Sequence, residues 1–136
     1  MISGAAGLIA SYLIDLIIVT NDILNTNIIV YALDKNEQLL EKRFPHDVFK
    51  NIKCFCIDIN KDNIPIGYAD YVVHAASNTS PLDYALKPIE TMHTNIIGTD
   101  CMLRFTAKSK AKRFLFCSSV EVYGRNNGDT DEFFED

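Results

Sequence analysis

Apolar residues along the chain switch between two spacings, one helical and one strand-like. From Leu8 to Leu24 they recur at the spacing of an amphipathic helix, and Thr26 to Leu33 is an apolar run rich in β-branched residues. Runs of the second kind are typical of strands that are buried on both faces of a parallel sheet. This part of the chain therefore predicts a helix followed by a buried strand.

Strands and helices continue to alternate along the rest of the chain. Cys54 to Ile59, Asp70 to Ser77 and Arg113 to Cys117 predict three further strands. Pro81 suits the first turn of a helix, and apolar residues at helical spacing extend this helix to about Lys110. The alternation predicts an α/β fold with a doubly wound parallel sheet of the Rossmann type, which binds ligands at the carboxyl ends of its strands.

A glycine-rich turn stands directly before the first predicted helix, in the sequence Ser3-Gly4-Ala5-Ala6-Gly7-Leu8-Ile9-Ala10. A strand that reverses into a helix within a few residues needs glycine for the tight backbone angles. A second glycine lets the backbone approach a pyrophosphate at the helix N-terminus. Gly and Ala also occur at such turns for packing alone, so the motif gains weight only in combination with residues later in the chain.

Asp34 follows the second predicted strand and closes a strand-helix-strand unit of roughly 30 residues. In dinucleotide sites a carboxylate at this distance accepts hydrogen bonds from the adenosine ribose, and it repels a 2′-phosphate. The alternative is that Asp34 caps the helix that starts near Asn36 and Glu37. Together with the glycines, Asp34 favours NAD over NADP, although the neighbouring Lys35 would suit a phosphate.

Composition and charge narrow the class of protein. The chain has 136 residues, of which 48% are apolar and 23% charged, as in a soluble globular protein with one domain or a large part of one. A net charge of −5 argues against a surface for nucleic acid or acidic membranes. Polar residues interrupt the most apolar window, Leu13 to Leu33, which predicts no membrane span, and no signal peptide is evident.

The cysteine pattern indicates reduced thiols in a cytoplasmic protein. The chain has no C-x-x-C pair, and its histidines show no ligand spacing with the cysteines. We therefore expect no metal site and four buried, unpaired thiols. They are Cys54, Cys56, Cys101 and Cys117.

A series of further short motifs comes after the glycine turn and Leu33-Asp34. They are Ile57-Asp58-Ile59, His74-Ala75-Ala76, Thr94-Asn95-x-x-Gly98-Thr99 and Ser118-Ser119-Val120-Glu121-Val122-Tyr123-Gly124. In their order and spacing, over nearly the whole chain, they resemble the NAD-dependent epimerase/dehydratase family. This family belongs to the extended short-chain dehydrogenases/reductases and acts on nucleotide sugars.

The resemblance implies NAD as the cofactor. It implies that amides around Leu8 and Ile9 hold the pyrophosphate, and that Asp58 with the backbone of Ile59 meets the adenine edge. Asp58 could instead be a turn residue after its strand. The implied cofactor-binding residues are Gly4, Gly7, Leu8, Ile9, Asp34, Asp58, Ile59, Ala75, Ala76 and Asn95.

Three of these residues have particular roles in the resemblance. Ala75 and Ala76 resemble small residues that let the end of a strand lie against the cofactor. Asn95 resembles a structural asparagine whose amide orders a backbone kink or a water near the catalytic groups, and a buried asparagine without a role would be costly. His74, beside the alanines, is expected in the core.

The last motif carries the expected catalytic groups. Ser119 matches the family's catalytic Ser/Thr, whose hydroxyl bonds the substrate oxygen during hydride transfer. Glu121 is either a second catalytic carboxylate or a solvated residue facing the cleft. Family 4,6-dehydratases carry Asp at the position of Val120, which disfavours that activity, whereas the pattern resembles that of sugar-nucleotide decarboxylases.

The chain also departs from the family pattern. The catalytic Tyr-x-x-x-Lys pair is absent after Ser119, and Tyr31 with Lys35, which has this spacing, lies on a predicted strand. Few residues precede Gly4, and the sequence stops in an acidic segment at Asp136. We expect residues 1–136 to be an NAD-binding Rossmann fragment, truncated at both ends relative to the family, without the carboxy-terminal substrate lobe and inactive alone.

The resemblance implies that the whole protein acts on a nucleotide sugar through a 4-keto intermediate, as an epimerase or dehydratase. Two alternatives stay open: a nucleotide-sugar decarboxylase of the same family, and a non-catalytic dinucleotide-binding protein that kept the fold. We expect a nucleotide-sugar substrate and neither nucleic acid nor membrane as a partner. A homodimer stays open.

Overall fold

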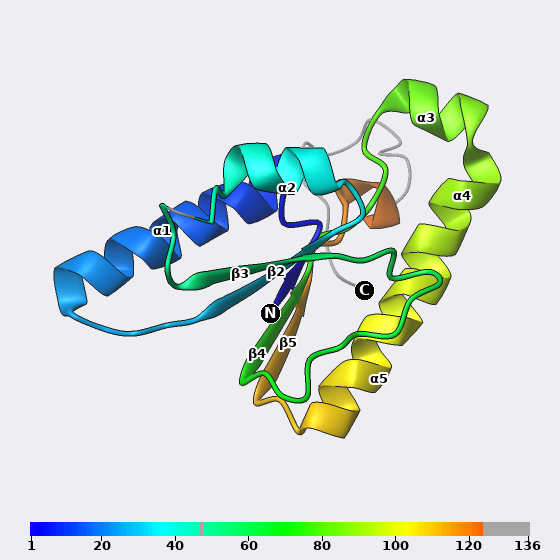
Figure 1. Ribbon diagram of the computed structural model, residues 1–136. Helices are drawn as coiled ribbons and strands as arrows, with labels where there is room; N and C mark the ends of the chain where they lie inside the picture. The colour runs from blue at the N-terminus through cyan, green and yellow to red at the C-terminus, as the bar shows by residue number, and fades with distance from the viewer. Residues whose placement is uncertain (47, 124–136) are drawn as a thin grey trace, which may run out of the picture.

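The computed structural model describes residues 1–46 and 48–123, and within them a parallel sheet forms the centre of the molecule (Figure 1). The sheet has five strands in the order β3-β2-β1-β4-β5, and all neighbouring pairs are parallel. The predicted α/β fold with a doubly wound sheet is confirmed. The strands are β1 (Ile2–Ser3), β2 (Val30–Asp34), β3 (Ile52–Cys56), β4 (Tyr71–His74) and β5 (Arg113–Phe116).

Helices cover both faces of this sheet. In Figure 1, α1 and α2 lie on one side and α4 with α5 on the other. In the described part of the chain, no helix combines the length and the apolar character that a membrane crossing needs. The helices are α1 (Leu8–Leu24), α2 (Glu37–Arg43), α3 (Pro81–Leu86), α4 (Pro88–His93), a π-helical segment (Thr94–Gly98), α5 (Thr99–Ser109) and a 3-10 turn (Val120–Tyr123).

The long helix expected from Pro81 to Lys110 is broken near its start. Pro88 cannot donate a backbone hydrogen bond, and it disfavours helical angles at Lys87, which has φ −133° and ψ 52°. After this break α4, the π-helical segment and α5 run on as one helix, since the backbone at Thr94 and Thr99 keeps helical angles. The prediction of a single helix is therefore wrong for its first turns.

The strand expected to begin at Thr26 begins at Val30 instead. Asn25 ends α1 in the left-handed conformation, with φ 49°. The side chain of Asn21 then holds the connecting loop: its amide donates to the Ile28 carbonyl over 2.9 Å, and its oxygen accepts the Ile28 N–H over 2.8 Å. These side-chain bonds replace the strand pairing that the apolar run suggested.

Two hydrophobic cores pack against opposite faces of the sheet. Ala32 and Leu33 are neighbours in β2 and fully buried, yet they belong to different cores because successive side chains of a strand point to opposite faces. Ile14 of α1 fills the first core and Met102 of α5 the second. Complete burial of such side chains contributes about 1.5–3 kcal/mol each.

The central strand β1 is short but pairs on both sides. Ile2 lies opposite Ala32 of β2 and Val73 of β4. The ladder continues at both ends of the strand, where the Met1 carbonyl accepts from Val73 N and the Ser3 carbonyl accepts from Ala75 N, over 2.9 and 3.2 Å. The brief first strand therefore satisfies backbone groups of both neighbours.

His74 is buried between β1 and α5, as expected for a core residue, and is 1% exposed. Its Nδ1 lies 2.7 Å from Ser3 Oγ, and its Nε2 lies 3.0 Å from Thr99 Oγ1. The Thr99 hydroxyl donates its own proton to the Asn95 carbonyl over 2.6 Å, so it can only accept from His74. We infer that neutral His74 carries its proton on Nε2 and accepts from Ser3.

The expectation of buried thiols is wrong. Cys54 and Cys56 are exposed because they lie on β3, an edge strand of the described sheet, and Cys101 and Cys117 are partly exposed. All four are free, as predicted.

We predict that protonation of His74 destabilises the fold. Burial lowers the pKa of His74 below its usual 6.5, so the unfolded chain binds this proton more readily than the folded chain. The contribution of His74 to stability is complete above about pH 6.5 and is lost as the pH falls below it. The free energy of unfolding, measured in urea from about pH 8 to pH 5, should decline at the acid end.

The variant His74→Gln should lose this part of the decline, while His93→Gln, at an exposed position, should keep it. Burial also lowers the pKa of the Met1 amino group, to about 6, which adds a decline common to all three proteins. Equal pH profiles for the wild type and His74→Gln would contradict the assignment.

Candidate functional site

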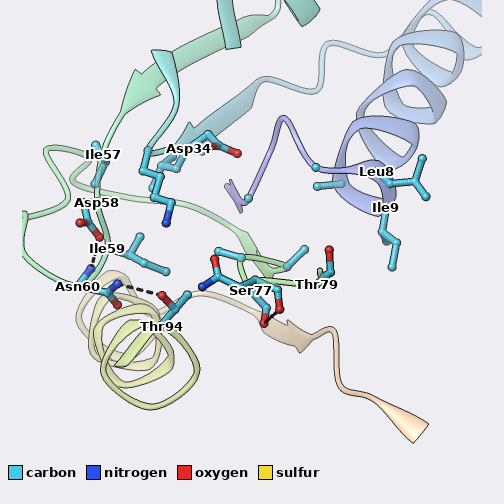
Figure 2. A pocket seen from close by; sticks show the side chains of 18 residues that line it. Leu8, Ile9, Asp34, Ile57, Asp58, Ile59, Asn60, Ser77, Thr79 and Thr94 are labelled. Atoms are coloured by element: carbon cyan, nitrogen blue, oxygen red, sulfur yellow. Dashed lines mark hydrogen bonds between the residues drawn. The ribbon is translucent and has the colours of Figure 1, made fainter. Parts of the chain in front are cut away.

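A cavity of about 380 Å³ lies at the carboxyl ends of the strands. Residues following β1, β2, β3 and β4 line it together with the first turn of α1 (Figure 2). This is the edge of the sheet where the fold class predicts a ligand. Of the expected cofactor-binding residues, those that line the cavity are Gly4, Gly7, Leu8, Ile9, Asp34, Asp58, Ile59, Ala75 and Ala76.

The glycine turn passes very close to the end of β4. Gly4 has φ +70°, and a Cβ there would lie 2.8 Å from the Ala75 carbonyl oxygen and from Ala76 N. A Cβ at Gly7 would lie 3.0 Å from the Gly4 carbonyl oxygen, which accepts the Gly7 N–H over 2.9 Å. Both glycines therefore have a steric reason in the folded chain itself.

The N-terminus of α1 opens onto the cavity. The first amides of a helix have no acceptor within the helix, and the N-cap residue Gly7 has no side chain that could accept from them. Leu8 and Ile9 are 75% and 65% exposed, and because their side chains are apolar, only their backbone can offer polar groups to the site. Free amides and the helix dipole make this end suited to an anion.

Asp34 joins the end of β2 to the glycine turn. One carboxylate oxygen accepts from Ala6 N over 3.1 Å and the other from Asn36 N over 3.0 Å. The cap of α2 is Asn36, whose side chain accepts from Leu39 N over 3.1 Å. The alternative of Asp34 as the helix cap is therefore wrong, and its carboxylate lines the cavity beside Lys35.

Asp58 combines the two interpretations that the sequence left open. It is a turn residue, because its Oδ1 accepts from Asn60 N over 3.1 Å and its Oδ2 lies 3.3 Å from Lys61 Nζ. It also lines the cavity, next to Ile59 (Figure 2). The turn thus fixes a carboxylate at the end of β3 without withdrawing it from the cavity.

Asn95 does not line the cavity, unlike the other expected cofactor-binding residues. It lies in the π-helical segment, and its side-chain oxygen accepts from Ser77 Oγ over 2.8 Å, where Ser77 is a lining residue. Its side chain is exposed, so the argument from burial was wrong. The role that the resemblance implied for the Asn95 amide, ordering a backbone kink or a water, stays a prediction.

The expected catalytic residues follow β5, beside the end of β4. Cys117 N donates to the His74 carbonyl over 2.9 Å, and Val122 N donates to the Ser119 carbonyl over 3.2 Å. Ser119 is exposed and does not line the cavity. The side chain of Glu121 lies outside the part of the chain that the structure describes, so the roles of both residues stay predictions.

Sequence reasoning missed several polar residues that line the cavity. Three of them directly follow Ala76, and the rule that ligands bind at strand ends would have reached them. Thr94 comes from a helix and could be placed only with the fold known. The missed polar residues are Asn60, Ser77, Asn78, Thr79 and Thr94, whereas Lys35, which also lines the cavity, was considered beside Asp34.

Residues 1–136 match the model of the NAD dependent epimerase/dehydratase family. This chain belongs to that family. The family resemblance drawn from the short motifs is thereby confirmed, and the family is NAD-dependent.

Two curated relatives align with most of the chain. UDP-glucuronic acid decarboxylase 4 from Arabidopsis thaliana is 31% identical over 128 residues, which cover 91% of this chain and 26% of the relative. UDP-glucuronic acid decarboxylase 1 from Danio rerio is 32% identical over 126 residues, which cover 91% of this chain and 28% of the relative. The chain thus spans little more than a quarter of their length.

Solved structures show the same fold. A dTDP-glucose 4,6-dehydratase double mutant from Streptomyces venezuelae, with NAD bound, has a TM-score of 0.72 at 20% identity, over 93% of this chain and 41% of that chain. A UDP-glucose 4-epimerase from Thermotoga maritima, with UDP-glucose, has a TM-score of 0.69 at 24% identity, over 92% of this chain and 39% of that chain. The family fold is therefore present over most of this chain.

We predict that Gly4→Ala strongly destabilises the fold. The positive φ and the contacts with Ala75 and Ala76 leave no room for a Cβ, which should lower the free energy of unfolding by about 2 kcal/mol or more. Gly67→Ala is the matched control, because its Cβ would meet nothing within 4 Å, and should change stability by less than about 0.5 kcal/mol. Urea unfolding of both variants measures this difference, and equal stabilities would contradict it.

Proposed function

We propose that this chain is the NAD-binding part of an enzyme that oxidises a nucleotide sugar to a 4-keto intermediate. The observation that carries the proposal is the convergence of Gly4, the open N-terminus of α1 and the Asp34 carboxylate on one cavity. When bound, NAD supplies the hydride acceptor.

The residues present suit a dinucleotide that lies across the end of β1. Amides of Leu8 and Ile9 would hold the pyrophosphate, close to a backbone that glycine keeps uncovered. Asp34 would accept from the ribose on the β2 side, with Asp58 and Ile59 beyond it at the adenine. Ala75 and Ala76 would leave room for the nicotinamide half on the β4 side.

A nucleotide sugar is proposed as the substrate because the family fold is shared with enzymes named for such compounds. Ser119 would hydrogen-bond the reacting sugar oxygen, and Glu121 would be a second carboxylate near it. Both residues follow β5, at the edge of the sheet that also bears Ala75 and Ala76. The substrate would therefore approach from the β5 side.

Decarboxylation is a second candidate, and the motif Ser119-Val120-Glu121-Val122-Tyr123-Gly124 favours it. The two curated relatives described above are named UDP-glucuronic acid decarboxylases. In such a reaction the 4-keto group would be the electron sink that lets a neighbouring carboxylate leave as carbon dioxide. UDP-glucuronic acid is thus the first substrate to try.

The cofactor preference follows from Asp34. Titration calorimetry should show tighter binding of NAD(H) than of NADP(H), because the carboxylate repels a 2′-phosphate. Asp34→Ala should reduce this discrimination by about tenfold or more, the effect of roughly 1.4 kcal/mol. Asp22→Ala removes an exposed carboxylate of α1 outside the cavity and should preserve it. Tighter binding of NADP(H) by the wild type would refute the assignment.

Catalysis needs a base that this chain does not supply after Ser119. We expect the 136-residue chain to form no NADH with UDP-glucuronic acid or UDP-glucose, because a serine hydroxyl alone is too weak a base at neutral pH. In a longer chain that carries the Tyr-x-x-x-Lys pair, Ser119→Ala should slow hydride transfer about 10²-fold. Absorbance in the NADH band measures both, and steady turnover by the 136-residue chain would show that the base lies elsewhere.

A further inference from the structure

Threonines of the continuous helix made by α4, the π-helical segment and α5 hold the loops of the cavity, and they do so with the same pair of hydrogen bonds. Each hydroxyl donates to the carbonyl four residues earlier, which leaves its oxygen to accept from another element. Thr91 bonds the Lys87 carbonyl in this way and accepts from Asn78 Nδ2 over 2.9 Å. Thr99 likewise donates to the Asn95 carbonyl and accepts from Nε2 of His74.

Thr94 makes the same pair of hydrogen bonds inside the cavity. Its hydroxyl donates to the Glu90 carbonyl over 3.0 Å and accepts from Asn60 Nδ2 over 3.0 Å. Thr94 is 7% exposed, and both it and Asn60 line the cavity, side by side in Figure 2. Because the Thr94 hydroxyl donates its proton to Glu90, its oxygen can only accept a further hydrogen bond. The Asn60 side chain therefore has to present its NH₂ group to Thr94, which fixes the orientation of the amide.

The other side of the Asn60 amide faces Gly98. Asn60 Oδ1 is buried without a hydrogen-bond partner, and a Cβ at Gly98 would lie 3.2 Å from it and 2.8 Å from Ile59 Cδ1. The loop thus lies directly against the π-helical segment that begins at Thr94. A buried carbonyl oxygen without a partner is unfavourable, so the bond to Thr94 has to hold the amide in place.

The backbone of Asn60 is bonded to the carboxylate two residues before it, since Asn60 backbone N donates to Asp58 Oδ1 over 3.1 Å. Asn60 therefore joins two sets of hydrogen bonds: its side chain is held by Thr94, which is itself bonded to Glu90, and its backbone holds the Asp58 carboxylate. Figure 2 shows Asp58, Asn60 and Thr94 at the end of the cavity away from Leu8 and Ile9. In the proposed function this is the adenosine end.

We propose that Thr94 is a positioning residue for the adenosine half of the cofactor, acting through Asn60 on the Asp58 turn. The proposal rests on the proposed function, since it needs adenosine at that end of the cavity. It assigns Thr94 no contact with the nicotinamide half. Loss of the hydroxyl should therefore weaken one half of the dinucleotide selectively.

The test compares two mononucleotides that represent the two halves of NAD. In titration calorimetry, Thr94→Val should weaken AMP binding about tenfold, the effect of losing one orienting hydrogen bond, and leave nicotinamide mononucleotide within about twofold. Thr94→Ser keeps the hydroxyl and should restore AMP binding. Asn60→Ala removes the other partner and should reproduce the loss, so the proposal stays testable if Thr94→Val fails to fold.

Thr106→Val is the matched control on the same helix. Thr106 makes the same bond to the carbonyl four residues earlier, at Met102 over 2.7 Å, and does not line the cavity. Its AMP affinity should equal that of the wild type. Unchanged AMP binding in Thr94→Val and Asn60→Ala, or an equal loss in Thr106→Val, would overturn the proposal. Failure of the wild type to bind AMP or NAD(H) would instead overturn the proposed function and the inference with it.

Discussion

The close approach between the glycine turn and the end of β4 is the constraint on which the site depends. At Gly4 the backbone leaves less room than a methyl group needs, and the turn is tied to both neighbouring strands. Ala5 N donates to the Leu33 carbonyl over 3.0 Å, and Ala75 N donates to the Ser3 carbonyl over 3.2 Å. The position of the first helix, and with it the open amides at its start, follows from these contacts.

Buried polar side chains are a second constraint on the positions of the elements around the cavity. His74 connects β1 to α5, and Thr94 connects the helix to the loop after β3. Each bond contributes only about 1 kcal/mol net, but leaving such a group unpaired costs more. The loops that form the cavity are therefore fixed by hydrogen bonds to a helix on one face of the sheet, while the glycine turn is fixed by the sheet itself.

Most of the fold could be predicted from spacing, because periodicity and strand alternation are local properties. Leu8–Leu24 is a helix as expected, and the strand order follows from the doubly wound pattern. Some predicted boundaries were wrong because of local side-chain contacts that the spacing of apolar residues does not reveal. One example is the Asn21 side chain, which holds the loop before β2. The exposure of Cys54 depends on the position of β3 at an edge of the described sheet, which is a tertiary fact.

Part of the candidate site could be predicted from the sequence because the carboxyl ends of the parallel strands meet at one edge of the sheet in this fold. Gly4 follows β1, Asp34 ends β2 and Asp58 follows β3, and all three line the cavity. Gly4 and Asp34 were found from their places in the strand-helix-strand unit, and Asp58 from the family motif. Thr94 was placed in a family motif, but its contact with Asn60, far away in the chain, has no signal in the sequence. Asn95 was assigned to the cofactor, and that assignment stays a prediction; its exposed side chain contacts the lining residue Ser77 and does not itself line the cavity.

Nuclear magnetic resonance of the ¹⁵N-labelled chain during titration with NAD tests the central claim most directly. If the cavity holds the dinucleotide, the amides of Gly7, Leu8 and Ile9 should shift in a saturable way, together with those of Asp58 to Asn60 and Ala75 to Ser77. Shifts confined to α5 and the loop from Asn63 to Gly67, which line a separate cavity, would contradict the account. The absence of any saturable shift would contradict it equally.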